Sequence, residues 1–334
     1  MYAPSTSSRK AGRRPAPNQP DRRPALRRFI ALLRPSDRLS LAWMAVTGIP
    51  AAWVLPGHLE QLGMPWWEIP LFHAAGFAAL AVFLPLTARS RHGIIVFVRS
   101  WYPLLLVPLL FAELYYLIPA VNPYDVDPFL QRVEVAVFGV VPAVWMQRLY
   151  WPPLTDALFI AYGMFYFLLL VPAVPLYRAG YLRKFDRFAF LVLLNCYMAF
   201  AIYFAMPCVG PGVALASQFS RKLQGVFAAQ FIYKTIHSLE GIHRDCFPSV
   251  HTQLSVVVLG YMYMHGWPSF RWILPITAAI VFATIYCRYH YTPDIAAGML
   301  LGLLSLGYYR KLYGRAACLG GKHRRKHKRQ TGIS

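Results

Sequence analysis

Residues 244–294 are RDCFPSVHTQLSVVVLGYMYMHGWPSFRWILPITAAIVFATIYCRYHYTPD. His251 and His290 stand near the two ends of this stretch, and two apolar runs, 252–264 and 272–287, lie between them. A helix of about 20 residues crosses a bilayer, at about 1.5 Å of rise per residue. The stretch therefore predicts a helical hairpin that brings both histidines to the same side of a membrane.

A carboxylate follows the second histidine at a spacing that suits catalysis. Asp294 comes four residues after His290. Pro293 disfavours helical geometry at Thr292, so we expect Thr292 as N-cap and Asp294 in the first turn of the next helix. A carboxylate near an imidazole fixes its tautomer and stabilises its charged form. His251, His290 and Asp294 are therefore the candidate catalytic residues.

The residues before His251 predict the start of a helix. Pro248 and Ser249 place His251 in the opening turn. That end of a helix offers free backbone N–H groups and a partial positive charge, which suit a phosphate, so Ser249 is a candidate phosphate-binding residue. A histidine there can donate a proton to a leaving oxygen. The alternative is a histidine that only caps the helix, and the pairing with His290 disfavours it.

These elements resemble those of a known family. FPSVHT (247–252) resembles the PSGH element of the type 2 phosphatidic acid phosphatase superfamily, and YHYTPDIAAG (289–298) resembles its closing HxxxD element. The phenylalanine before Pro248, and the absence of glycine before His251, resemble the branch of this superfamily that contains fungal inositol phosphorylceramide synthase. HYTPD is also similar to the HYTxD element of sphingomyelin synthases. The resemblance implies that His290 is a nucleophile forming a phosphohistidine, with His251 as acid and Asp294 as its orienter.

The expected phosphate-binding cations depart from the family pattern. The family's first motif, KxxxxxxRP, has no counterpart outside the N-terminal tail, and Thr284 stands where the third motif usually carries arginine. Arg244 and Arg288 are the leading candidates because each is close in sequence to a catalytic histidine. Three further cations, for which solvated loop charge is favoured, are Arg221, Lys222 and Lys234.

The composition indicates a membrane protein. Of 334 residues, 57% are hydrophobic and 14% charged, which is too apolar for an ordinary soluble domain. The net charge of +21 could suggest nucleic acid. However, the excess Lys and Arg lie in the tails and in short loops between apolar runs, as topology-setting charges do. We therefore predict a membrane, and no nucleic acid, as partner.

The apolar runs predict an all-α, polytopic integral membrane helix bundle of about eight transmembrane helices, with a six-helix catalytic core. In lipid, only a helix satisfies its backbone hydrogen bonds internally. The runs are 39–56, 69–88, 98–120, 154–177, 185–206, 248–265, 271–288 and 293–313. Segment 121–153 alternates charged and apolar residues and is expected to lie along the membrane interface.

The chain divides into four predicted parts. Residues 1–36 are a disordered basic cytoplasmic tail, and 37–97 hold two additional N-terminal transmembrane helices. Residues 98–313 form the lipid phosphatase/phosphotransferase membrane core, and 314–334 are a basic cytoplasmic tail. With the basic loops inside, the catalytic stretch faces the extracytoplasmic side of a plasma (inner) membrane, or the lumen in a eukaryote.

The sequence does not decide the role of the glycines in 206–212 or the redox state of the cysteines. MPCVGPG (206–212) resembles a turn in bacterial relatives, and its glycines allow close backbone approach, either to shape a headgroup pocket or simply to turn. The five cysteines show no CxxC spacing. A disulfide among Cys208, Cys246 and Cys287 near the active face stays open, although buried small residues are favoured.

No metal or cofactor is predicted. His237 and His243 could join His251 in a metal site, but their spacing is loose, and the resemblance implies chemistry without a metal.

The sequence thus predicts metal-independent cleavage of a phosphoester in a lipid phosphate or phospholipid. Either water or an alcohol can accept the phosphoryl group. The resemblance to inositol phosphorylceramide synthase favours a transferase, and simple lipid phosphatases share the same machinery. A polytopic transporter or scaffold without catalysis is the alternative from another class. A polar cluster at helix ends, rather than at mid-membrane, argues against it.

Overall fold

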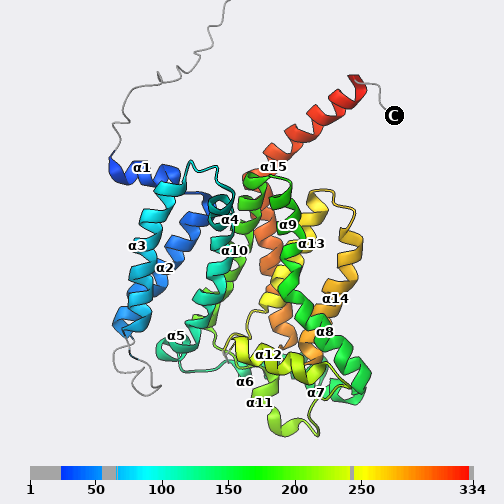
Figure 1. The fold of residues 1–334 in the computed structure, drawn as a ribbon. Helices are drawn as coiled ribbons and strands as arrows, with labels where there is room; N and C mark the ends of the chain where they lie inside the picture. The colour runs from blue at the N-terminus through cyan, green and yellow to red at the C-terminus, as the bar shows by residue number, and fades with distance from the viewer. Residues whose placement is uncertain (1–23, 55–64, 66, 241–243, 331–334) are drawn as a thin grey trace, which may run out of the picture.

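The computed structural model of the protein describes residues 24–54, 65, 67–240 and 244–330. Within these ranges all regular secondary structure is helical (Figure 1). This confirms the predicted all-α class.

Over the described residues the predicted apolar runs coincide with helices, but the run 98–120 is divided at Glu113 into the helices Gly93–Ala112 and Leu114–Val121. The long helices are α2 (Pro35–Val54), α3 (Glu68–Thr87), α4 (Gly93–Ala112), α8 (Pro152–Leu168) with α9 (Leu170–Arg178), α10 (Leu182–Ala205), α13 (Val250–Met264), α14 (Phe270–Tyr286) and α15 (Thr292–Gln330). In the described residues, four spans are long and apolar enough to cross a membrane: α3, α4, α8 with α9, and α10. The protein is therefore a polytopic helical membrane protein, while the count of eight spans stays a prediction.

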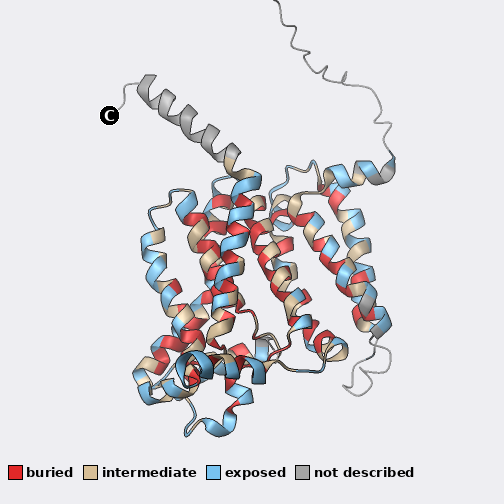
Figure 2. Ribbon diagram, turned by 180° about the vertical axis from the view of Figure 1, so that it is seen from behind, coloured by how far each residue is buried: buried red, intermediate tan, exposed pale blue. Residues whose placement is uncertain are grey.

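Helix α10 is the centre of the bundle. It packs against α2, α4, α13 and α15, and more than half of its own residues are buried in the interior of the bundle (Figure 2). Asn195 of α10 accepts a hydrogen bond from Gln253 of α13 at 2.8 Å and donates one to Ser305 of α15 at 2.9 Å. Hydrogen bonds between helices hold membrane bundles together, so this triad fixes α13 and α15 against α10.

Small residues bring α13 and α15 into close contact. A Cβ atom at Gly302 would lie 2.9 Å from the carbonyl oxygen of Gln253, and one at Gly298 would collide with the carbonyl oxygen of Ser249. Glycine at both positions lets the two backbones approach, as small residues do in membrane bundles. The first turns of α13 and α15, which carry His251 and Asp294, are thereby placed side by side.

Short helices gather at one end of the bundle. They are α5 (Leu114–Val121), α6 (Asp127–Phe138), α7 (Pro142–Trp145), α11 (Pro211–Ala214) and α12 (Ala229–Glu240), with the 3-10 helix Met146–Leu149 after α7. Segment 121–153 is thus helical but broken, with a bend of 69° between α6 and 142–149. The loops that join α3 to α4, α9 to α10 and α13 to α14 lie at the opposite end (Figure 1).

The N-terminal prediction was wrong for part of its range. Residues 1–23 of the expected disordered tail lie outside the described residues, but Ala25–Leu32 forms helix α1, which packs against α3. Packing against α3 provides a tertiary contact that an isolated tail lacks. At the other end, α15 continues through most of the predicted basic tail.

Candidate active site

His251 lies in the first turn of α13, as predicted. Ser249 is the N-cap of this helix, and its hydroxyl accepts a hydrogen bond from the backbone N–H of Thr252 at 3.3 Å. The His251 side chain is buried, and within the described part of the chain its Nε2 atom has no hydrogen-bond partner. A buried polar atom without a partner marks a place where a ligand can bind.

Aromatic rings of α8 hold the His251 imidazole. The Tyr162 ring stacks on it with 4.3 Å between centroids, and the Phe165 ring lies 4.1 Å away. Tyr162 also stacks on Tyr289, at 4.5 Å, so the stack connects α8 to the link that carries His290. The sequence analysis missed these aromatic residues, because aromatic side chains inside an apolar run carry no signal of a site.

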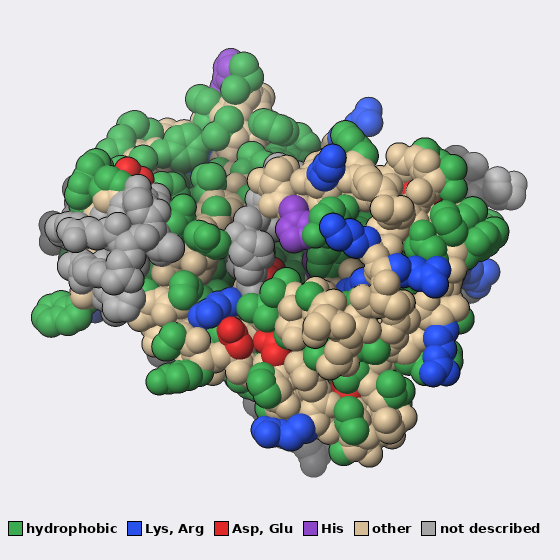
Figure 3. Space-filling view, turned by 90° about the horizontal axis from the view of Figure 1, so that it is seen from below, with side chains coloured by type: hydrophobic (Ala, Val, Ile, Leu, Met, Phe, Trp, Pro, Cys, Tyr) green, Lys and Arg blue, Asp and Glu red, His purple; other side chains and the backbone are tan. Residues whose placement is uncertain are grey.

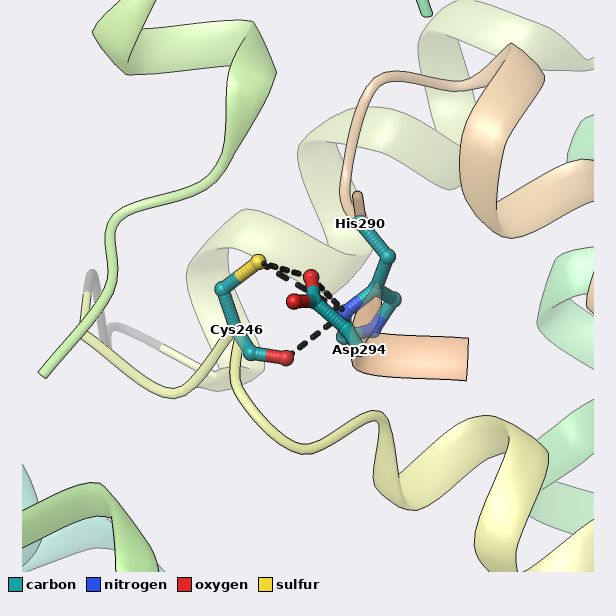
Figure 4. Close-up of side chains that lie close together, drawn as sticks. All are labelled: Cys246, His290 and Asp294. Carbon is teal, nitrogen blue, oxygen red and sulfur yellow. Dashed lines mark hydrogen bonds and ion pairs between the residues drawn. The ribbon is translucent and has the colours of Figure 1, made fainter. Parts of the chain in front are cut away.

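The His290 ring is oriented through its Nδ1 atom (Figure 4). This atom lies 2.8 Å from the carbonyl oxygen of Cys246 and 3.5 Å from Oδ2 of Asp294. Because both neighbours are acceptors, we assign the proton to Nδ1. The lone pair of Nε2 is then available to attack an electrophile.

Asp294 lies in the first turn of α15, as predicted, and its side chain is fully buried. Its Oδ2 atom accepts hydrogen bonds from the Tyr291 N–H at 2.7 Å and from the Cys246 thiol at 2.8 Å. Burial raises the pKa of the Cys246 thiol well above its ordinary value, so the sulfur keeps the proton that it donates. Cys246 therefore contacts both His290 and Asp294, a role that the sequence analysis did not assign.

The structure brings the three candidate catalytic residues together. The His251 and His290 rings lie 5.7 Å apart between centroids, at 60° to each other. Ser249 joins the group through its backbone N–H, which donates to the carbonyl oxygen of Asp294 at 3.1 Å. The three candidate side chains thus lie in one buried cluster.

The two leading cations have other partners. Arg244 forms an ion pair with Asp125 at 3.3 Å and donates to the carbonyl oxygen of Pro123. The guanidinium of Arg288 lies over the Phe219 ring, 3.8 Å from its centroid, and donates to the carbonyl oxygen of Arg221 at 3.0 Å. Neither contact involves a catalytic histidine. Sequence proximity alone therefore did not reveal where these side chains point.

The remaining candidate cations lie on the end face of the bundle. Arg221 and Lys222 line an open depression of about 530 Å³ together with Tyr150, Ser220 and Gln224. Figure 3 shows this face, where Lys and Arg side chains gather along one side of a hollow. Lys234 is exposed on α12.

Two acidic residues of α6 hold the link between His290 and α15. Glu134 Oε1 accepts hydrogen bonds from the Thr292 N–H at 2.6 Å and the Thr292 hydroxyl at 2.8 Å. Thr292 is the first residue of α15 rather than the predicted N-cap, and its hydroxyl donates to Glu134 instead of accepting from the helix. Asp127 Oδ1 accepts from the Tyr291 hydroxyl at 3.0 Å. The sequence could have indicated Glu134 and Asp127 through the rarity of acidic residues, because the whole chain has only 13.

The glycines of MPCVGPG permit the close approach that the sequence suggested. Gly210 has φ 83°, and a Cβ atom there would lie 2.6 Å from the carbonyl oxygen of Tyr289. The Gly212 N–H donates to the carbonyl oxygen of Arg288 at 2.8 Å. The carboxylate of Asp127 accepts from the N–H groups of Val209 and Gly210, both at 2.9 Å. This turn therefore packs directly on the link that carries His290.

Within the described residues, one group of three side chains could coordinate a metal ion. Cys246, His290 and Asp294 each offer a ligand atom within 4.8 Å of the others, and this sulfur, nitrogen and oxygen set suits zinc. Of the histidines considered from sequence, His243 lies outside the described residues, and His237 and His251 are not in this group. Here, hydrogen bonds connect the three side chains.

Comparison with known proteins agrees with this geometry. A family model described as PAP2 superfamily matches residues 128–308, which hold His251, His290 and Asp294 and lie within the predicted core 98–313. Searches of curated proteins and of solved structures gave no match. The matched region covers more than half of the chain, and membership of this superfamily indicates phosphatase chemistry on a phosphorylated lipid at the membrane. The chain belongs to the PAP2 superfamily.

Proposed function

We propose that this protein is a metal-independent lipid phosphatase or phosphotransferase that works through a phosphohistidine on His290. The observation that carries the proposal is the orientation of His290. Its Nδ1 atom is held by the Cys246 carbonyl and by Asp294, and the His251 ring lies 5.7 Å away. A nucleophile oriented by a carboxylate and paired with an acid is the arrangement that covalent catalysis requires.

The proposed reaction has two steps. Nε2 of His290 attacks phosphorus, the bond from phosphorus to the leaving oxygen breaks, and His251 gives that oxygen its proton. Asp294 stabilises the positive charge on the His290 ring. Water or an alcohol then attacks the phosphohistidine and passes its proton to His251, so the histidines return to their starting states. With water, a lipid phosphate gives inorganic phosphate and a phospholipid gives the phosphorylated headgroup; with an alcohol, either gives a new phosphoester.

Ser249 and the N-terminus of α13 are the proposed contacts for the phosphate. The first N–H groups of a helix and its partial positive charge favour an anion, and His251 lies in that same turn. Arg244 and Arg288 stay proposed phosphate ligands. Each must exchange its present partner, Asp125 or the Arg221 carbonyl, before it can bind a headgroup.

The acceptor decides whether the protein is a hydrolase or a transferase. The FPSVHT and HYTPD elements support the inositol phosphorylceramide synthase branch, hence transfer of a phospho-headgroup. Purified protein should be tested with a panel of phospholipids, lipid phosphates and lipid pyrophosphates, and both phosphate release and new lipid products should be measured. We expect turnover of at least one lipid phosphoester. New lipid formed only with an added alcohol would identify a transferase, and release of phosphate in water a hydrolase.

Two controls sharpen this assay. The His290→Ala protein, prepared in parallel, reports any contaminating phosphatase. Treatment with EDTA should leave the activity unchanged, because His290 is held by hydrogen bonds and the proposed steps need no metal. Loss of activity with EDTA that zinc or magnesium restores would favour a metallohydrolase. Absence of turnover on every lipid would favour a transporter or scaffold.

The active site is proposed to face the extracytoplasmic side of a plasma membrane. The basic loops 89–93 and 177–187 favour the cytoplasm, and the catalytic end lies opposite them in the bundle (Figure 1). A membrane-impermeant maleimide added to intact cells should label Gln230→Cys, which is exposed on α12, and should not label Arg91→Cys. Labelling in the reverse pattern would place the site in the cytoplasm.

A further inference from the structure

Two cysteines from distant segments meet beside His290. Cys208 belongs to the MPCVGPG turn, and Cys246 precedes α13. The Cys246 N–H donates to the Cys208 carbonyl oxygen at 3.1 Å, and both side chains belong to one buried cluster. Both side chains are buried, and both are thiols in this structure.

We propose that Cys208 and Cys246 are joined by a disulfide in the mature protein, and that this disulfide raises the activity of the neighbouring catalytic pair. The bond rests on the contact between the two residues and on the proposed extracytoplasmic orientation, because disulfides form and persist in oxidising compartments. The effect on activity rests on the proposed function.

Forming the disulfide is a two-electron oxidation of Cys208 and Cys246. The two thiols lose two protons and two electrons, and a bond forms between their sulfur atoms. The electrons pass by thiol–disulfide exchange to the disulfide of an oxidising dithiol protein, which becomes a dithiol. Since both cysteines are buried in the folded chain, this exchange takes place while the chain folds.

The disulfide changes what Asp294 binds. In the thiol form, Cys246 donates to Asp294 Oδ2 at 2.8 Å, whereas His290 Nδ1 lies 3.5 Å from the same oxygen. The thiol therefore competes with His290 for this carboxylate. Oxidation removes the thiol proton, and Oδ2 then serves the His290 ring and the Tyr291 N–H. The carboxylate is better able to stabilise the positive charge that His290 gains on phosphorylation.

The same bond would also fix the site sterically. It ties the turn that packs on Tyr289 and Arg288 to the segment whose carbonyl oxygen orients His290. Cys196 in α10 and Cys287 at the end of α14 are also buried, and neither contacts Asp294 in the described residues. These two cysteines are therefore matched controls.

Whether Cys208 and Cys246 form a disulfide can be tested without any activity assay. Full-length protein from the membrane should be denatured and alkylated, with and without prior reduction, and its cysteine peptides analysed by mass spectrometry. We expect Cys208 and Cys246 to be alkylated only after reduction and to appear as a linked pair before it. Cys196 and Cys287 should be alkylated in both samples. Alkylation of Cys208 and Cys246 without reduction would overturn the disulfide, whatever the protein's activity.

The effect on catalysis is tested by two variants that both lack the disulfide. Cys208→Ala leaves the Cys246 thiol as a donor to Asp294, whereas Cys246→Ala removes it. We expect Cys208→Ala to have the lower kcat, by about two- to tenfold, the effect of one competing hydrogen bond, with similar KM. Loss of the disulfide is common to both variants, so their difference isolates the thiol. Equal kcat values, or a higher kcat for Cys208→Ala, would overturn this part.

The two proposals fail separately. If no variant turns over any lipid while the linked peptide is found, the disulfide stands and the proposed function fails. If lipid turnover is measured while Cys208 and Cys246 are alkylated without reduction, the function stands and the disulfide is wrong.

Discussion

His290→Ala is expected to abolish turnover and to remove any acid-labile phosphoenzyme. A nucleophile cannot be bypassed, because the intermediate is a bond to it. The measurement is an assay with a lipid phosphoester labelled in its phosphoryl group, in which the protein is quenched under denaturing conditions and its labelled phosphate is tested for acid lability. Loss of both signals together would identify His290 as the residue that carries the phosphoryl group.

Two variants serve as references for this result. His92 is exposed in the loop before α4, far from the site in sequence, so His92→Ala should keep normal turnover. Asp294→Asn keeps the shape of the side chain but loses the charge that stabilises the imidazolium, so its rate should lie between those of His290→Ala and the unchanged protein. If the phosphoenzyme persisted in His290→Ala but was lost in His251→Ala, His251 would be the nucleophile and His290 the acid.

His251→Ala is expected to lose roughly 10²–10⁴-fold in rate on a lipid phosphoester, the usual contribution of general acid catalysis. The loss should be much smaller on p-nitrophenyl phosphate. An acid matters most when the leaving oxygen is strongly basic, as an alkoxide is, and a nitrophenolate needs little protonation. The measurement is the ratio of rates on the two substrates, in the variant and in the unchanged protein.

This ratio distinguishes the loss of a general acid from a loss of packing in the His251→Ala protein. The His251 ring stacks on Tyr162 and contacts Phe165, so its removal also empties space between α13 and α8. A purely structural defect would lower both rates by a similar factor, which would contradict the assignment of His251 as the acid. Near-normal rates on both substrates in His251→Ala and in His290→Ala would show that these residues are not catalytic.

Features that depend on neighbouring residues could be predicted from the sequence. The apolar runs determined the helices, because a chain in lipid must satisfy its backbone within each segment. Pro248 with Ser249, and Pro293 before Asp294, set the helix starts that place His251 and Asp294 in first turns. The two motif elements also sufficed to identify the superfamily. The disordered tail was wrong at Ala25–Leu32, because that helix is stabilised by packing on α3.

The tertiary structure decided which partners the functional side chains have. Arg244 binds Asp125, Glu134 binds Thr292, and the Cys246 thiol donates to Asp294, and none of these pairs is close in sequence. Charge and spacing alone cannot show which buried donor meets which buried acceptor, because that depends on how α6, the MPCVGPG turn and α15 pack together. The sequence by itself therefore determined the long apolar helices, the family and the three candidate catalytic residues. Only the packing of distant segments decided what orients His290, what surrounds His251 and where the cations point.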